Sequence, residues 1–165
     1  HIPQTSVRAF LLGCIQPDRN PMTYLKGSFR HQWLRGHNYR NARRFMKRIS
    51  RRLEAKDKLN LYDYYTLGKL IHYTADAFTY AHNKDFPSQL RNHMAYEATL
   101  QVHFLSYLEQ EPQVDIILAK NIMDAICQYH LDYEQEESSI HNDSRFALAA
   151  CCCVLAALYA KPLLS

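Results

Sequence analysis

The chain has 165 residues, a formal net charge of +4 and 47% hydrophobic residues. That apolar share is ordinary for a globular protein, so composition excludes a largely disordered chain, and the length suits one domain with a sizeable core. Only four glycines occur, and the long stretches between turn signals have helical rather than alternating periodicity. We therefore predict an all-α fold in which residues 1–165 form a single-domain bundle of about six helices.

The first expected helix is short and lies close to the start of the chain. It covers Thr5–Leu12, because Gly13 and Pro17 interrupt the helical pattern that follows. Turn-forming residues recur over the next stretch, which we expect to be irregular up to about residue 37. This interpretation predicts that Asp18 lies in a loop.

A basic helix is expected next, over about Asn38–Lys56. Residues 26–58 contain twelve Lys or Arg but only two acids, so the rest of the chain is net negative. An apolar stripe is formed by Ala42, Phe45, Met46, Ile49 and Leu53. The cations on the other faces are Arg40, Arg43, Arg44, Lys47, Arg48, Arg51 and Arg52. They indicate either a solvated face or a surface that attracts phosphate, on nucleic acid or on lipid head groups.

Four more helices follow in chain order. Their expected ranges are about 59–81, 88–109, 112–134 and 146–158, where Ser88 would cap the second and Pro112 would begin the third. The polar stretch 135–143 is predicted to be a linker. The strongly apolar last segment is shorter than the roughly 18–20 residues of a membrane span, so it indicates a buried helix.

The five cysteines are Cys14, Cys127 and the run 151–153. They form no CxxC motif and no even framework of spaced pairs, so we expect free thiols, which favour a reducing, cytoplasmic compartment. No secretory signal is visible at the start of the sequence. Because the chain begins with His1 rather than Met, secretion stays open as an alternative.

The most informative pattern combines two His/acid pairs with a histidine between them. His72 precedes Asp76 by four residues, His93 precedes Glu97 by four, and His82 lies between the pairs. Residues four apart share one face of a helix, so each pair can converge on an ion held between helices. Imidazole and carboxylate suit zinc, and manganese or iron can occupy similar sites. The histidines outside this pattern, which fit packed or solvated positions, are His103, His130 and His141.

This spacing resembles the zinc-dependent phospholipase C family, which is related in fold to the single-strand-specific zinc nucleases. The family's core reads H-x-x-x-D, then a histidine six residues past that Asp, then H-x-x-x-E. His72, Asp76, His82, His93 and Glu97 fill all five positions. The resemblance covers about residues 9–105.

Three further positions are suggested by the same resemblance. The family has an Asp in a loop after a helix, commonly following Gly and Pro, which here corresponds to Asp18. It also has a histidine before its long helix, for which we prefer His37 in Gly-His-Asn, with His31 as the alternative. Members usually complete a third metal position with an N-terminal residue and a further histidine, which this sequence lacks upstream of Asp18; His1 is one candidate substitute.

The resemblance implies a phosphodiester hydrolase of the phospholipase C type that uses two or three zinc ions and a metal-activated water. One ion would be held by Asp18, His37, His72 and Asp76, and another by His82, His93 and Glu97, with Asp76 able to bridge to a third. Asp18 would also act catalytically by orienting the water. The implied partners are a phospholipid head group or another phosphodiester, with contact to a membrane surface. Two alternatives are a zinc nuclease that binds nucleic acid and a non-catalytic protein in which zinc only stabilises the bundle.

Overall fold

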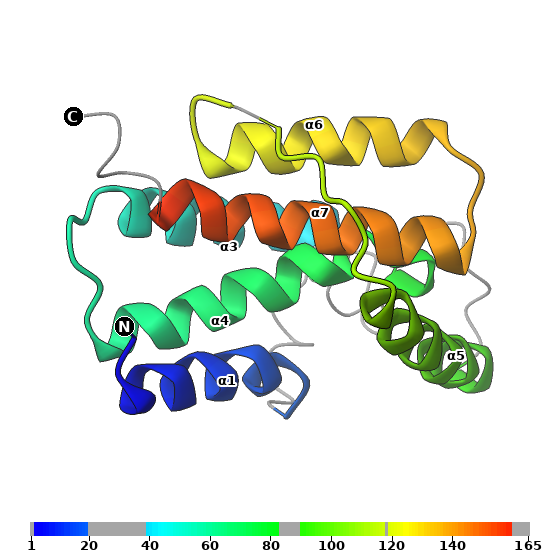
Figure 1. Ribbon diagram of the computed structural model, residues 1–165, viewed down its shortest axis with the longest axis horizontal. Coiled ribbons are helices and arrows are strands. Elements are labelled where there is room, and N and C mark those ends of the chain that lie inside the picture. The colour runs from blue at the N-terminus through cyan, green and yellow to red at the C-terminus, as the bar shows by residue number, and fades with distance from the viewer. Residues whose placement is uncertain (1, 20–38, 83–89, 118, 160–165) are drawn as a thin grey trace.

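A computed structural model describes residues 2–19, 39–82, 90–117 and 119–159, and these residues contain helices and no strand (Figure 1). The α-helices are α1 (Gln4–Arg19), α3 (Tyr39–Glu54), α4 (Leu61–Asp76), α5 (Leu90–Glu109), α6 (Ile122–Gln135) and α7 (Ile140–Tyr159), and a single 3₁₀ turn, η1 (Tyr80–His82), follows α4. The predicted all-α fold with about six helices is confirmed for these residues. That the whole chain is one domain stays a prediction.

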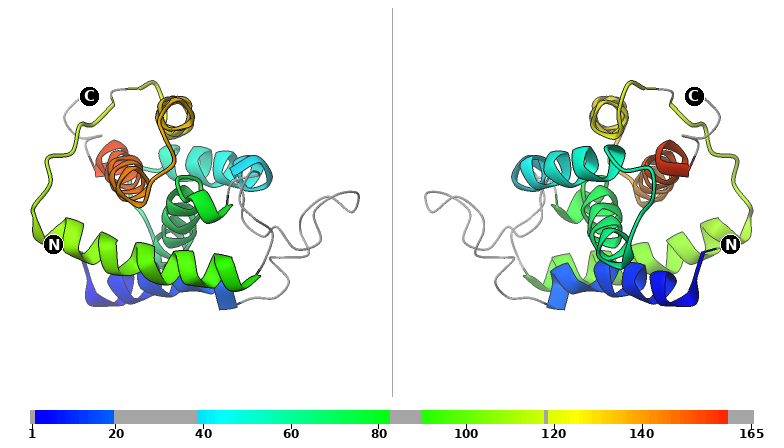
Figure 2. Two further views of the ribbon diagram at one scale, coloured as in Figure 1. Left: turned by 90° about the vertical axis from the view of Figure 1, so that its right-hand side faces the viewer. Right: turned by 90° about the vertical axis from the view of Figure 1, so that its left-hand side faces the viewer.

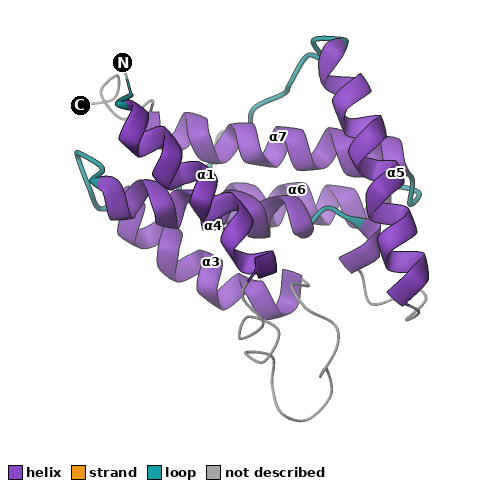
Figure 3. Cartoon of the chain, turned by 90° about the horizontal axis from the view of Figure 1, so that it is seen from below, coloured by secondary structure: helices purple, strands orange, loops and turns teal. Residues whose placement is uncertain are grey.

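Helix α4 lies in the middle of the bundle, between α1 on one side and α3 and α7 on the other (Figure 2). Its side chains Leu67 and Leu70 are fully buried. Helix α5 lies apart from this group and crosses one end of the bundle, where it packs on α7 and η1 (Figure 3). The C-terminal end of α4 therefore faces the N-terminal half of α5.

The basic helix is confirmed as α3, and its two faces are divided as predicted. Four of the five stripe residues, Ala42, Met46, Ile49 and Leu53, are buried, and Phe45 packs against them while partly exposed. The seven cations of the helix all lie at exposed positions. Burial of the apolar stripe on α4 and α6 thus fixes which face carries the positive charge.

The prediction that Gly13 and Pro17 end the first helix is wrong, because α1 continues through both to Arg19. Gly13 lies against Gly68 of α4. A Cβ at position 13 would come within 2.0 Å of the Tyr65 carbonyl oxygen, and one at position 68 within 2.1 Å of the Phe10 carbonyl oxygen. The glycines therefore allow two helix backbones to touch, and Asp18 lies in the last turn of a helix rather than in a loop.

Two boundaries in the C-terminal part are also wrong. Pro112 begins no helix, since residues 111–117 are irregular and α6 starts at Ile122, where the Asn121 side chain accepts a hydrogen bond from Asp124 N at 3.0 Å. Helix α7 starts at Ile140, inside the predicted linker, and Ser139 Oγ accepts from Asn142 N at 3.1 Å. In both cases a capping side chain fixed the start of the helix.

All five cysteines are free thiols, as expected, although only Cys153 is fully buried. None of the helices in the described ranges is both long and apolar enough to cross a membrane.

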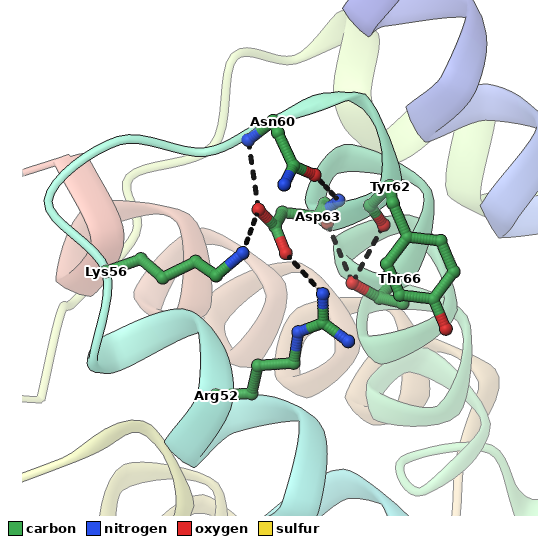
Figure 4. A network of polar contacts seen from close by, with 6 residues as sticks. All are labelled: Arg52, Lys56, Asn60, Tyr62, Asp63 and Thr66. Atoms are coloured by element: carbon green, nitrogen blue, oxygen red, sulfur yellow. Dashed lines mark hydrogen bonds and ion pairs between the residues drawn. The ribbon is translucent and has the colours of Figure 1, made fainter.

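The N-terminal end of α4 is held by Asp63, whose side chain is fully buried (Figure 4). Its carboxylate accepts hydrogen bonds from Lys56 Nζ at 2.5 Å and from Arg52 Nη2 at 3.1 Å. It also accepts from Asn60 N at 2.9 Å, while the Asn60 side chain accepts from Asp63 N at 3.0 Å. The reciprocal capping box of Asn60 and Asp63 fixes the start of α4. The contacts of Asp63 with Arg52 and Lys56 join that start to the C-terminal end of α3 and the loop after it.

Candidate metal centre

The centre begins at the C-terminal end of α4, where His72 and Asp76 lie one turn apart. Their side chains meet as the spacing predicts, with His72 Nε2 at 3.1 Å from Asp76 Oδ2. Helix α1 ends beside them and brings Asp18 Oδ1 to 3.4 Å from the same imidazole nitrogen. The Gly13–Gly68 contact positions this part of the site, because it sets how closely α1 approaches α4.

The other half of the centre comes from η1 and α5. His93 and Glu97 lie one turn apart on α5, with His93 Nε2 at 2.9 Å from Glu97 Oε1. His82 is held by η1, and its Nε2 lies 3.3 Å from the same Glu97 oxygen. These three side chains each offer one ligand atom within 4.8 Å of the others, which is compact enough to hold a metal ion.

Asp76 connects the two halves. Its Oδ2 contacts His72, and its Oδ1 lies 3.7 Å from His82 Nε2. A carboxylate with one oxygen toward each half has the geometry of a bridging ligand. Of the predicted site residues, the structure brings together Asp18, His72, Asp76, His82, His93 and Glu97; His37, its alternative His31, and His1 lie outside the described residues.

The carboxylates make this centre electronegative. Burial alone would lower the pKa of His72, but the hydrogen bond and charge of Asp76, together with Asp18, raise it above its ordinary value. For His82, Glu97 and Asp76 likewise outweigh burial and raise the pKa. The hydrogen bond from His82, joined by the nearby His93, lowers the pKa of Glu97 against the effect of burial. The centre therefore stabilises added positive charge, as a proton or as a metal ion.

A profile of the family described as zinc dependent phospholipase C matches residues 4–162. The chain belongs to this zinc-dependent phospholipase C family. No curated protein gives a significant match, and no solved structure does. The family match extends beyond residues 9–105, on which the resemblance rested, and includes α6 and α7.

The donor atoms suit the zinc that the family name implies. Three imidazoles and three carboxylates supply the nitrogen and oxygen ligands that zinc binds, and their contacts already gather them without large rearrangement. The donors differ in access to solvent, since His72 is 10% exposed whereas Asp18 is 66% and Glu97 46% exposed. Asp18 and Glu97 are thus the donors that a substrate in solution can reach most readily.

Two tyrosines beside the centre were given no role from the sequence. Tyr80 precedes His82 by two residues, and Tyr96 directly precedes Glu97; both donate hydrogen bonds to the buried carboxylate of Asp143 on α7. The sequence could have indicated a role for these tyrosines only through their positions next to the candidate ligands. The histidines predicted to lie outside the centre do so, since His103 bonds Ser144 and His130 stacks on Tyr39.

Proposed function

We propose that this protein hydrolyses phosphodiesters of phospholipids by phospholipase C chemistry, with zinc held by Asp18, His72, Asp76, His82, His93 and Glu97. Membership of the family supports the reaction class. The observation that carries the proposal is the convergence of these six side chains, from α1, α4, η1 and α5, on one solvent-accessible centre.

The candidate ligands have different roles in this proposal. When bound, zinc supplies Lewis-acid stabilisation of the phosphate and lowers the pKa of water. His72 and His82 are largely buried, so their rings are fixed to hold ions rather than to move protons. Asp18 is the most exposed of the six, and its carboxylate is therefore the group best placed to accept a proton from the attacking water. Glu97, with its lowered pKa, stays ionised at neutral pH.

The basic face of α3 supports a lipid surface as partner. Arg48 lies over the Phe45 ring at 5.4 Å, Phe45 meets Tyr73 edge-on at 5.2 Å, and Tyr73 meets His72 edge-on at 5.4 Å. A series of three contacts, from Arg48 through Phe45 and Tyr73 to His72, therefore connects the exposed cations of α3 with the metal centre. A bilayer presents many phosphates at once, so cations beside the site would hold the surface while one head group enters.

The first experiment measures metal content by elemental analysis together with hydrolysis of a chromogenic phosphocholine diester, before and after chelation. Two or three zinc ions per chain with chelator-sensitive turnover are expected. His72→Ala and Glu97→Gln should lose turnover, whereas His141→Ala, which changes an exposed histidine outside the centre, should keep it. Bound zinc without turnover in the wild-type protein would contradict the proposal and favour a structural metal.

The same cations favour one other candidate, a nuclease of the related fold. Single-stranded DNA offered in the same assay separates the two substrates. Faster cleavage of DNA than of phosphatidylcholine vesicles, with a rate that falls steeply with salt, would favour the nuclease.

A further inference from the structure

Asp143 is a buried carboxylate that joins three elements of the bundle. It lies in the first turn of α7 and is fully buried. Its Oδ2 accepts hydrogen bonds from Tyr80 N at 2.8 Å and from Tyr96 Oη at 2.8 Å, and its Oδ1 accepts from Tyr133 Oη at 2.7 Å. A buried carboxylate that accepts three hydrogen bonds fixes its donors strongly, because losing any of them leaves charge unsatisfied.

Two of these three donors belong to elements that carry candidate ligands. Tyr80 opens η1, which ends at His82, and Tyr96 sits on α5 between His93 and Glu97. The Tyr80 and Tyr96 rings also meet edge-on at 5.8 Å. One carboxylate therefore holds η1 and α5 at the distance from each other at which all three ligand side chains converge.

Apolar packing alone holds α5 weakly. Among its residues 92–109 no side chain is fully buried, whereas α4, α6 and α7 each bury several. Polar contacts between α5 and α7 include the Tyr96–Asp143 hydrogen bond and the His103–Ser144 contact at 2.9 Å. The first of these lies beside the ligand candidates.

We propose that Asp143 is a positioning residue for the His82–His93–Glu97 half of the metal centre, acting through Tyr80 and Tyr96. The proposal rests on the metal assignment made above but not on the reaction. The three hydrogen bonds that Asp143 accepts come from Tyr80, Tyr96 and Tyr133. None of these donors lies on α1 or α4, which carry the other half of the centre, Asp18, His72 and Asp76. Loss of Asp143 should therefore weaken one zinc site more than the other.

A matched pair of tyrosine variants tests this. Tyr96→Phe and Tyr133→Phe each remove one hydroxyl from the same carboxylate, at 2.8 and 2.7 Å, but α6, which carries Tyr133, holds no candidate ligand. Loss of a group that orients a ligand usually costs about 10–100-fold in metal affinity. We expect that loss at one site in Tyr96→Phe and in Asp143→Asn, and less than about threefold in Tyr133→Phe.

The measurement is a zinc titration against a chromophoric competitor, which resolves the sites, combined with hydrogen exchange of α5 in chelator. Faster exchange of α5 amides in Tyr96→Phe than in Tyr133→Phe is expected even without zinc. Equal losses of zinc affinity in the two tyrosine variants, or unchanged affinity in Tyr96→Phe, would overturn the positioning role. Wild-type protein that binds zinc but hydrolyses nothing would defeat the proposed function and leave this inference standing; wild-type protein that binds no zinc would overturn both.

Discussion

The two ends of α4 each hold an aspartate, and the partners of these aspartates differ in kind. Asp63 at the N-terminal end faces Lys56 and Arg52, which carry permanent positive charge. Asp76 at the C-terminal end faces His72 and His82, which are cationic only when protonated. The negative charge of Asp63 is neutralised by cations of the chain itself. The negative charge of Asp76 is not neutralised while its histidines are unprotonated, so a bound metal ion would stabilise it.

Because of this difference, the N-terminal end of α4 contributes mainly to stability, whereas its C-terminal end contributes to the metal centre. The Asp63 network joins α3, the following loop and α4, and every partner comes from residues 52–63. The centre at the other end joins α1, α4, η1 and α5, elements far apart in the sequence. Substitutions at the two ends should therefore affect different measurements.

The largest expected effect is the loss of zinc at the Asp76 end. At free zinc a thousandfold above its dissociation constant, binding stabilises the folded chain by about 4 kcal/mol. His72→Ala and His93→Ala should each lose most of that increment and much of the bound metal, while their stability in chelator changes little. Thermal unfolding with and without chelator measures the increment. Normal metal content in both variants would remove the basis for the site assignment, and His141→Ala serves as the control.

The next effect concerns the Asp63 end. Asp63→Ala removes a fully buried carboxylate from two cations that are 30% and 45% exposed. Because those cations can reach water, we expect the free energy of unfolding to fall by about 3 kcal/mol, the lower end of the range for breaking a buried pair. Zinc affinity of the folded variant should stay unchanged. Urea unfolding in chelator, with zinc titration of the folded protein, checks both halves; weakened zinc binding would show that the two ends are coupled.

The same contrast explains which features the sequence could predict. His72 with Asp76, and His93 with Glu97, are local pairs whose geometry follows from the helical period, and α3 follows from its apolar stripe. Gly13 was misread because a glycine that ends a helix and one that admits a neighbouring helix look alike in sequence. Asp143 could not be assigned, since its donors come from residues 80, 96 and 133 and meet only in the folded bundle.

A smaller effect is expected in the middle of α4, where Gly68→Ala tests how α1 reaches the centre. Helix propensity favours Ala by up to about 1 kcal/mol. The new Cβ would lie 2.1 Å from the Phe10 carbonyl oxygen, however, so α1 must move away. We expect a net loss of about 2 kcal/mol, as in overpacked cores, together with weaker zinc binding at the half that contains Asp18. A stabilised Gly68→Ala variant would contradict the close contact of α1 with α4.

The smallest effect is the pH dependence of the metal-free chain, and its sign differs between the two ends. Burial would raise the pKa of Asp63, but hydrogen bonds from Lys56 and the Asn60 amide, with the charge of Arg52, lower it overall. A lowered pKa in the folded chain gives stability that is present above the unfolded value of about 3.9 and is lost as pH falls through the folded pKa. Asp63→Asn should therefore reduce the loss of stability that the metal-free chain shows as pH falls. The reduction is about 1.4 kcal/mol for each pH unit by which the pKa of Asp63 is lowered.

The raised pKa values of His72 and His82 give the opposite slope at the other end. Stability from their protonated forms is complete below about pH 6.5 and is lost as pH rises through the folded pKa values. His72→Ala should therefore flatten the loss of stability across neutral pH, whereas Asp63→Asn should leave that loss unchanged. Urea unfolding in chelator from pH 3 to 8 measures both effects. If Asp63→Asn also flattened the loss of stability across neutral pH, the two aspartates would not differ in the charge of their partners as the contacts indicate.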